Sequence, residues 1–281
     1  MCAIGGYYSV SGRPTPVRAI KSLWKAMEAR GTHAAGLAVG WTDSDKPMSF
    51  KAAKRAGQML KVVNKYAKGD NTQYVMLHTR FTTQGSVKNN GNNHPITNHG
   101  ITLTHNGVLY NDDEIFNCVK KDFGVKRVNE VDTEAINAAL CCYTPQWTLE
   151  NIDGSMSIAW VDDRESTGTV NLATNGENPL VIGRTKSNDI VWASTKQILE
   201  KSDFVLKEVF HATPYKVYTI KPDGIIRSRY VSTFRSEPHY GYYRASRDIF
   251  PTLSSIPSQA RTNEEEWAKW AYSQKRGWVK E

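Results

Sequence analysis

The sequence predicts an α+β fold, in which helices and strands pack as separate layers. Amphipathic helical stretches are concentrated in the first half of the chain, and strand patterns follow one another from residue 155 to residue 230. This order suits packed layers better than the strand-helix alternation of a parallel sheet. The sequence contains no fixed-period repeat and no low-complexity tract.

The first predicted helix runs from Thr15 to Gly31. Thr15 can cap this helix, Pro16 suits its first turn, and Gly31 ends it. A strand is expected over 34–41, and residues 51–68 are predicted to form a helix or a strand followed by a helix. The first helix carries one apolar stripe, formed by Val17, Ile20, Trp24 and Met27.

Two short apolar strands are predicted at 73–80 and 101–105, with a polar loop between them that contains glycine. Two helices follow: Asn111 opens one that Gly124 closes, and Asp132 opens the other. A turn at Asp223-Gly224 separates two of the later strands. Those later strands are expected at 155–161, 169–174, 179–184, 189–195, 215–220 and 224–231.

The last part of the chain differs in character. Residues 239–258 mix Tyr, Arg, Pro and Ser without periodicity. Asn263 and Glu266 then form a cap pattern for a short helix that carries Trp267 and Trp270. This segment is interpreted as a peripheral appendage.

The composition is that of an ordinary globular protein. The 281 residues are 40% hydrophobic and 23% charged, which excludes a disordered, collagen-like or coiled-coil architecture. No run approaches the roughly 18 apolar residues of a membrane helix, and the N-terminus lacks the features of a secretory signal. The cysteines, at positions 2, 118, 141 and 142, contain no CxxC pair. We expect a cytoplasmic protein without a membrane partner.

The net charge of +8 comes from the two ends of the chain, whereas residues 71–224 are slightly acidic. Basic ends can bind nucleic acid or an acidic protein, but a positive surface is a non-specific signal, so nucleic acid is not the expected partner.

Four of the seven histidines fall at 78, 94, 99 and 105, a spacing that follows no metal motif and includes no acidic residue. No metal and no cofactor are expected.

Cys2 is the first indication of chemistry. A small side chain at position 2 allows the initiator methionine to be removed, which leaves a cysteine with a free α-amino group. Such an amine titrates near pH 7.7 to 8.0, so it can take the thiol proton directly or through a water. The alternative is a small residue at the start of a strand without any catalytic role.

Four further segments of the sequence support a catalytic role for Cys2. Together with the N-terminal MCAIG they occur in the order and approximate spacing of class II glutamine amidotransferase domains, a family of N-terminal nucleophile hydrolases. The chain resembles this family over roughly residues 2–220. The segments are RGTHAAG at 30–36, HTRFTTQG at 78–85, HNGVLYN at 105–111 and VDTEAI at 131–136.

The resemblance implies a four-layer αββα sandwich of two antiparallel sheets with a short C-terminal appendage. On this basis residues 2–225 form the glutaminase domain, and residues 226–281 form an aromatic and basic appendage that can serve as a docking segment.

The resemblance also implies an oxyanion hole at Asn106-Gly107. The pair stands at the end of the predicted strand, where Asn106 can supply a side-chain amide and Gly107 a backbone N–H to a tetrahedral oxyanion. The alternative is that Asn-Gly is only a turn.

By the same resemblance, Arg80 holds the α-carboxylate of the substrate in a forked pair and Asp132 binds its α-ammonium. Thr83 and Gly85 shape the same pocket. The alternatives are a surface arginine and an aspartate that only caps its helix. The chain departs from the family at Ala3, His33, Phe81, Thr82 and Gln84, which puts substrate affinity and loop closure in doubt more than the chemistry.

The resemblance therefore implies an enzyme in which Cys2 attacks the side-chain amide of L-glutamine. Glutamate forms through a γ-glutamyl thioester, and ammonia passes to a separate amidoligase or synthase subunit. Two alternatives stay open: a related N-terminal-cysteine hydrolase of another amide, and a non-catalytic binding module that uses its basic ends.

Overall fold

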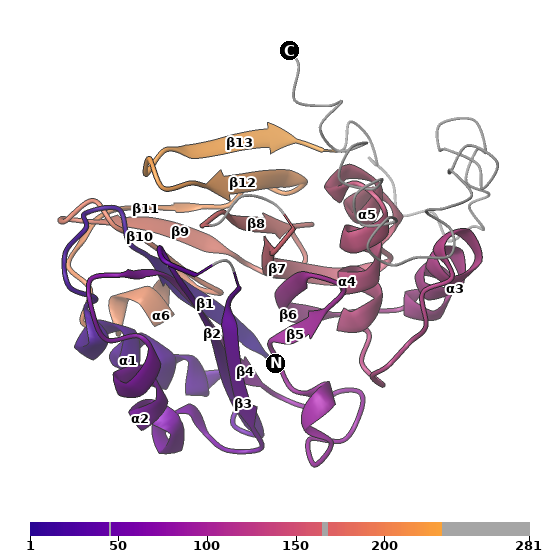
Figure 1. Cartoon of the computed structure of the whole chain (residues 1–281), viewed down its shortest axis with the longest axis horizontal. Helices are drawn as coiled ribbons and strands as arrows, with labels where there is room; N and C mark the ends of the chain where they lie inside the picture. Colours follow the sequence, from indigo (N-terminus) through magenta and orange to yellow (C-terminus); the bar gives the residue numbers. More distant parts are fainter. Residues whose placement is uncertain (45, 165–167, 232–281) are drawn as a thin grey trace.

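A computed structural model describes residues 1–44, 46–164 and 168–231 of the chain (Figure 1). Two antiparallel sheets pack against each other, and helices cover the outer face of each sheet. The predicted four-layer αββα sandwich is therefore confirmed.

The first sheet has the strand order β11-β9-β10-β1-β4-β2-β3. Its strands are β1 (Ala3–Tyr8), β2 (Ala34–Trp41), β3 (Met48–Ala52), β4 (Thr72–Arg80), β9 (Val181–Thr185), β10 (Ile190–Ala193) and β11 (Leu206–His211). β1 lies between β10 and β4, and its residue Ala3 pairs with Thr79. The start of β1, next to Cys2, therefore lies beside the end of β4, where Arg80 stands.

The second sheet has the strand order β13-β12-β8-β7-β6-β5. Its strands are β5 (Ile96–Asn98), β6 (Ile101–Leu109), β7 (Gly154–Asp162), β8 (Val170–Thr174), β12 (Lys216–Ile220) and β13 (Ile226–Tyr230). The predicted turn at Asp223-Gly224 connects β12 to its antiparallel partner β13.

A core of apolar side chains lies between the two sheets. Ile4 of β1 and Met76 of β4 meet Ala159 of β7 and Leu172 of β8, all fully buried. Because alternate residues of a strand face the same side, this core identifies which side chains of each strand point into the space between the sheets.

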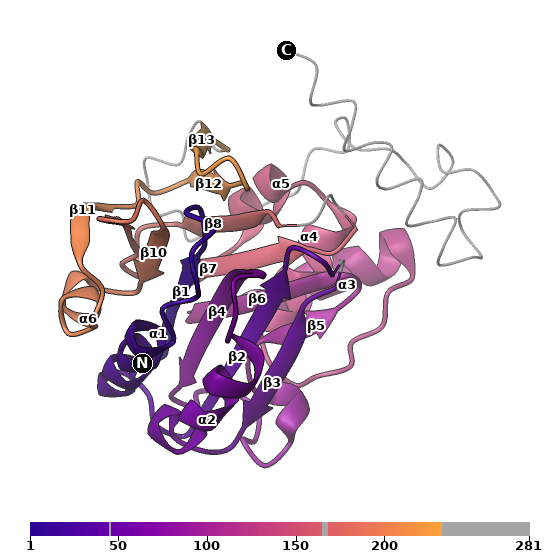
Figure 2. The same ribbon diagram turned by 60° about the vertical axis from the view of Figure 1, so that its left-hand side comes forward.

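Two groups of helices form the outer layers (Figures 1 and 2). Those on the first sheet are α1 (Val17–Ala26), α2 (Ala56–Tyr66) and α6 (Lys196–Glu200), with a 3-10 turn η1 at Met27–Ala29. Those on the second sheet are α3 (Asp112–Phe123), α4 (Thr133–Cys142) and α5 (Pro145–Asn151). A second 3-10 turn, η2, spans Asn90–Asn92.

The helix predictions are largely confirmed, with one correction. The predicted apolar stripe is buried at Ile20 and Trp24 of α1 and at Met27 of η1. Gly124 ends α3 in the left-handed conformation with φ 72°. Thr15 does not cap α1, because its hydroxyl donates to the Gly69 carbonyl at 2.6 Å. α1 begins instead after Pro16.

One strand is longer than predicted. β6 continues past residue 105 to Leu109, so Asn106 and Gly107 lie within the strand, paired with Ser157 and Met156 of β7. Asn-Gly is typical of turns, and this local preference gives way here to the hydrogen-bond ladder with β7. The segment predicted as a polar loop contains the short strand β5, which pairs with β6. The short elements β11, α5 and α6 were not predicted either.

The boundary predicted at residue 225 falls inside the hairpin of β12 and β13, so 226–230 form a strand of the second sheet. Residues 232–281, with the helix predicted near Trp267, lie outside the described part of the chain. Within the described ranges, no helix is both long enough and apolar enough to span a bilayer.

Candidate active site

The candidate site lies between the two sheets, where β1, β4, β6 and β10 meet. Cys2 directly precedes β1, and Ile4, two residues later, belongs to the core between the sheets. Asn106 of β6 approaches from the second sheet, and its Nδ2 lies 3.5 Å from the Oγ of Ser194. Ser194 in turn accepts a hydrogen bond from the backbone N–H of Ile4 at 3.0 Å. The predicted nucleophile and the predicted oxyanion donor thus border the same space.

The Cys2 thiol makes its hydrogen bonds with the backbone of Phe81. Its Sγ lies 3.4 Å from both the N and the O of that residue, and the Cys2 carbonyl accepts a 2.8 Å hydrogen bond from Arg30 Nε. Burial raises the pKa of the Cys2 thiol, while the Phe81 N–H, the N-terminal ammonium and Arg80 act to lower it. Since burial dominates, the thiol needs a base before it can act as a nucleophile at neutral pH.

Met1 precedes this thiol in the encoded chain and is 69% exposed. Its Sδ lies 3.5 Å from the Arg30 guanidinium, so Arg30 contacts both of the first two residues. The peptide bond that an aminopeptidase would cut is therefore at the surface.

Only glycine fits at position 107, next to Asn106, because the backbone of β7 packs closely against this point of β6. A Cβ at this position would lie 1.9 Å from the Ser155 carbonyl oxygen of β7, a distance that no side chain can adopt. Asn106 itself is 1% exposed. The local chain can therefore present one amide side chain and one backbone N–H at this point of β6.

Arg80 is buried at the end of β4 and is engaged with the loop that follows it. Its Nη1 donates to Asn93 Oδ1 at 2.8 Å, and its Nη2 donates to the carbonyls of Gln84 and Gly85. Both hydrogens of Nη2 are thus used. A carboxylate that binds through a fork including Nη2 must displace one of these carbonyls, so a forked ion pair at Arg80 requires this loop to rearrange.

His33 holds the first part of the same loop. Its Nδ1 accepts the backbone N–H of Thr82 at 3.0 Å, and its ring stacks on Phe81 with 4.6 Å between ring centroids. Thr83 is exposed and has no side-chain hydrogen bond to any described residue, while Gly85 adopts a left-handed φ of 68°. His33 departs from the family pattern, yet it anchors the loop that carries the Phe81 backbone against Cys2.

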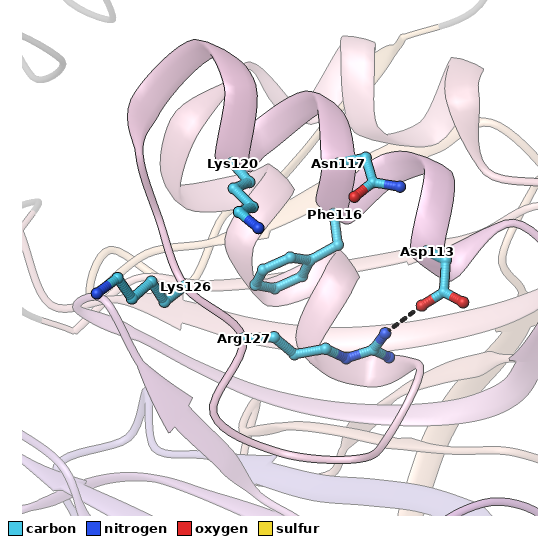
Figure 3. A pocket seen from close by; sticks show the side chains of 6 residues that line it. All are labelled: Asp113, Phe116, Asn117, Lys120, Lys126 and Arg127. Atoms are coloured by element: carbon cyan, nitrogen blue, oxygen red, sulfur yellow. Dashed lines mark hydrogen bonds and ion pairs between the residues drawn. The ribbon is translucent and has the colours of Figure 1, made fainter.

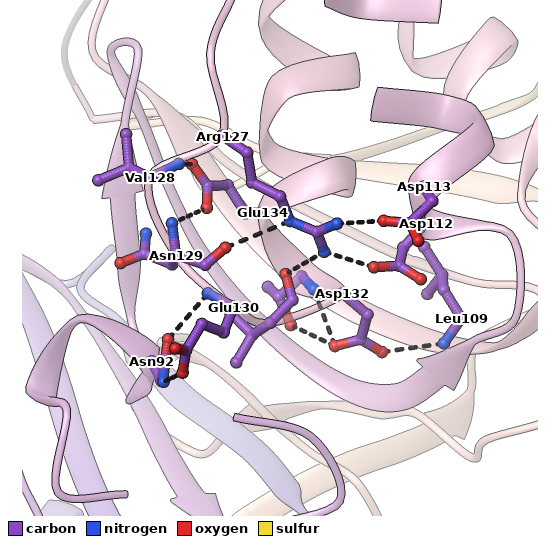
Figure 4. A network of polar contacts seen from close by, with 12 residues as sticks. Asn92, Leu109, Asp112, Asp113, Arg127, Val128, Asn129, Glu130, Asp132 and Glu134 are labelled. Carbon is purple, nitrogen blue, oxygen red and sulfur yellow. Dashed lines mark hydrogen bonds and ion pairs between the residues drawn. The ribbon is translucent and has the colours of Figure 1, made fainter. Parts of the chain in front are cut away.

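Asp132 occupies the N-terminus of α4 and joins that helix to β6 (Figure 4). Its Oδ1 accepts the Thr133 N–H at 2.8 Å, and its Oδ2 accepts the Leu109 N–H at 2.9 Å. A carboxylate has about four acceptor positions, so lone pairs remain for an ammonium group. The capping role that was the simpler alternative is confirmed.

The segment before Asp132 is fixed by charged side chains (Figure 4). Glu134, which is fully buried, accepts the backbone N–H groups of Val128 and Asn129. Arg127 forms ion pairs with Asp112 and Asp113 of α3. These contacts hold the backbone that carries Asp132 in one position.

Three of the four histidines singled out in the sequence form a buried cluster. His94 Nε2 and His105 Nδ1 lie 2.8 Å and 3.0 Å from the same Thr133 hydroxyl, and His78 stacks on His94. Burial lowers the pKa of all three, that of His78 to about 3, so they are neutral at pH 7. Within the described residues, no group of three or more His, Cys, Asp and Glu side chains is placed to hold a metal.

A separate hollow of about 450 Å³ lies on the outer helix layer (Figure 3). Phe116 and Lys120 of α3 line it together with Arg127, whose ion pair with Asp113 closes one side. It does not include the Cys2 site.

Sequence reasoning gave no role to Arg30, Thr133 or Ser194, although all three contact the site residues. Arg30 and Thr133 lie inside the quoted motifs, so their positions were visible in the sequence. Ser194 carried no signal, because a serine after a strand is common and its partners are distant in sequence.

Comparison with known proteins supports the assignment of a class. Residues 78–201 match the family described as glutamine amidotransferase domain. The glutamine--fructose-6-phosphate aminotransferase [isomerizing] of Staphylococcus aureus is 27% identical over 239 residues, covering 80% of this chain and 37% of that protein. The protein of the same name from Staphylococcus epidermidis is 28% identical over 214 residues, covering 72% and 34%. The chain thus spans little more than a third of these relatives.

Solved structures share the fold. The glutamine phosphoribosylpyrophosphate amidotransferase of B. subtilis superposes with a TM-score of 0.66 at 19% identity, over 83% of this chain and 50% of that one. A glutamine aminotransferase class-II domain protein from Silicibacter pomeroyi gives a TM-score of 0.52 at 16% identity, over 83% and 100%.

The two packed antiparallel sheets and their outer helices have the fold of the glutamine phosphoribosylpyrophosphate amidotransferase structure. Over residues 78–201 the chain is similar to glutamine amidotransferase domains, and over most of its length it is similar to the two aminotransferases.

Proposed function

We propose that this chain hydrolyses the side-chain amide of L-glutamine with Cys2 as the nucleophile. The observation that supports this most is electrostatic: Arg80, at the end of β4, acts to lower the pKa of the Cys2 thiol, and Asp132, at the N-terminus of α4, acts to raise it. A cation and an anion near the same nucleophile suit the carboxylate and ammonium groups of an amino acid. Ammonia release from glutamine by the purified chain is the direct test.

In this proposal the α-amino group of Cys2, freed from Met1, takes the thiol proton. The thiolate attacks the amide carbon, and Asn106 Nδ2–H and Gly107 N–H stabilise the oxyanion. The oxyanion collapses as the α-ammonium gives its proton to the leaving nitrogen, which departs as ammonia and leaves a γ-glutamyl thioester. The amine then takes a proton from water, whose hydroxide cleaves the thioester to glutamate and restores the thiol.

The α-amino group suits the role of base better than the nearby histidines. The thiol contacts the Phe81 backbone, whereas His78 bonds the His105 carbonyl and His105 bonds Thr133. The lowered pKa values of these two histidines make them weak bases at neutral pH.

We further propose that the ammonia passes to a separate amidoligase or synthase subunit in the cytoplasm, a compartment in which thiols stay reduced. Ammonia release measured with and without candidate acceptor enzymes tests this step. Faster glutamine turnover in the presence of one acceptor would identify it, and equal turnover with all of them would contradict the coupling.

One observation favours a second candidate, a related hydrolase of another amide. The Nη2 group of Arg80 is fully occupied by Gln84 and Gly85, so the chain as described does not display a free fork for an α-carboxylate. Comparing glutamine with simple primary amides separates the two functions, because only the glutaminase requires the charged groups of the substrate.

We expect Arg80→Ala and Asp132→Asn to raise the KM for glutamine with smaller effects on kcat. Each change removes an ionic contact to a part of the substrate that does not react, at a cost on the order of 2 to 5 kcal/mol. Steady-state kinetics measure the split. Glutamine blocked at its α-carboxylate should be a poor substrate for wild type and should discriminate less between wild type and Arg80→Ala. Equal sensitivity of both proteins to this block would refute the role of Arg80.

We expect kcat/KM to rise with pH through the neutral range. The pKa of the Cys2 thiol is raised by burial, so the proton must pass to an amine that is free only as pH approaches roughly 7.7 to 8.0. The pKa of His78 is about 3, so titration of this residue should not change kcat/KM in the neutral range. A profile that is flat between pH 5.5 and 8.5 would contradict the amine as base.

A further inference from the structure

Ser194 stands at the point where the two halves of the candidate site meet. It directly follows β10, is fully buried, and its backbone N–H donates to the Ile4 carbonyl at 2.9 Å. This bond places Ser194 opposite Ile4, on the face of the first sheet that looks into the space between the sheets. Its side chain therefore lies two residues along β1 from Cys2.

The Ser194 hydroxyl has all of its hydrogen-bonding capacity in use. It accepts the Ile4 N–H at 3.0 Å, it accepts from Asn106 Nδ2 at 3.5 Å, and it donates to the Ile4 carbonyl at 3.4 Å. A hydroxyl offers one donor and two acceptors, so these three bonds account for all of it. The donation to Ile4 leaves its oxygen as an acceptor, which fixes the nitrogen of the Asn106 amide, and not the oxygen, toward Ser194.

We propose that Ser194 is a positioning residue of the oxyanion hole, because its hydroxyl links the Asn106 amide of the second sheet to β1, the strand that directly follows Cys2. This inference rests on the proposed glutaminase function. One Nδ2 hydrogen of Asn106 points to Ser194, and within the described residues the other has no partner, so it is available to the oxyanion. Preorganised donors of this kind act without reorganisation at the moment of reaction.

Ser194 contacts no reacting atom, so its removal should act through Asn106. Ser194→Ala should lower kcat for glutamine by roughly 10- to 100-fold, less than the loss of a whole donor, and leave KM nearly unchanged. In an Asn106→Ala background the same change should have almost no further effect on kcat, since the amide that Ser194 orients is already absent. Losses that multiply in the double variant would overturn the proposal.

Ser157→Ala provides the matched control. Ser157 is also fully buried and pairs with Asn106 across β6 and β7, but its hydroxyl donates to the Asn178 carbonyl at 2.7 Å. The Ser157→Ala variant should therefore have a kcat within a few-fold of wild type. A loss in Ser157→Ala equal to that in Ser194→Ala would show that any buried hydroxyl at this place matters, and would refute a specific link to Asn106.

A second measurement tests whether Ser194 holds the Asn106 side chain, and it does not depend on catalytic activity. In protein labelled with ¹⁵N-asparagine, the side-chain amide signals of Asn106 are assigned by their loss in Asn106→Asp, and their exchange with solvent is followed. Exchange should be at least several-fold faster in Ser194→Ala than in wild type and in Ser157→Ala. Equal exchange in all three would refute the positioning role. Wild type that releases no ammonia would instead refute the glutaminase function, while the exchange result still decides Ser194.

Discussion

A protein that keeps Met1 should hydrolyse no glutamine, and Cys2→Ala should be equally inactive. A retained methionine converts the α-amino group of Cys2 into an amide, which cannot take the thiol proton. Burial raises the pKa of this thiol, so little thiolate forms without a base. The expected loss is complete within assay limits. Both variants should fold, because Met1 is largely exposed and the hydrogen bonds of the Cys2 thiol are with the backbone of Phe81 alone among the described residues.

Intact-mass analysis and a glutamine-derived electrophile provide the measurement. Active protein should lack Met1 and should be labelled at Cys2, while Cys118, Cys141 and Cys142 stay unmodified. A short uncleaved tag before Cys2 serves as a second way to block the amine. If homogeneous Met1-retaining protein turned over glutamine at the wild-type rate, the N-terminal nucleophile mechanism would be wrong, and His78 or His105 would have to be reconsidered as the base.

Most strands and helices of the core were predictable because the apolar patterns and turn residues that specify them lie within short stretches of sequence. Strand β2, helix α3 and the β12-β13 hairpin each show the expected period or turn in a few residues. β11 was missed because four of its six residues, Lys207, Glu208, Phe210 and His211, are exposed at the edge of the sheet, so it lacks an apolar pattern. The layer order came from the family resemblance, since no local pattern states which sheet faces which.

The site residues that fall within the quoted motifs were predictable. The contacts between residues far apart in the sequence were not. Cys2, Arg80 and Asp132 were named from their segments, and their mutual electrostatic influence is a property of the folded chain. Ser194 was not predictable, because it acts across 88 positions of sequence. The occupation of Arg80 by its own loop was hidden for a similar reason: hydrogen bonds to carbonyl groups leave no trace in residue types.

Replacement of Asn106 by alanine should reduce kcat by roughly 100-fold or more with a smaller effect on KM, because the Asn106 amide is needed most when charge develops on the oxyanion. A 100-fold loss corresponds to about 2.7 kcal/mol of transition-state stabilisation. The amide is 1% exposed and lies in a ladder with β7, so water cannot readily replace it as a donor. Steady-state kinetics on folded protein provide the test, with unfolding curves to verify stability.

Asn137→Ala is the control that separates oxyanion stabilisation from the loss of any buried amide. Asn137 lies in α4, is fully buried, and its Nδ2 donates to the backbone carbonyls of Ile96 and Ile101. Its removal leaves carbonyl groups unsatisfied and should cost about 1 to 3 kcal/mol of folding stability without a large change in kcat. Asn106→Ala should show the reverse, a large kinetic loss at a modest cost in stability. If its kcat fell only a few-fold, the oxyanion would have to be bound by donors other than the Asn106 side chain, and Gly107 would lose its proposed partner.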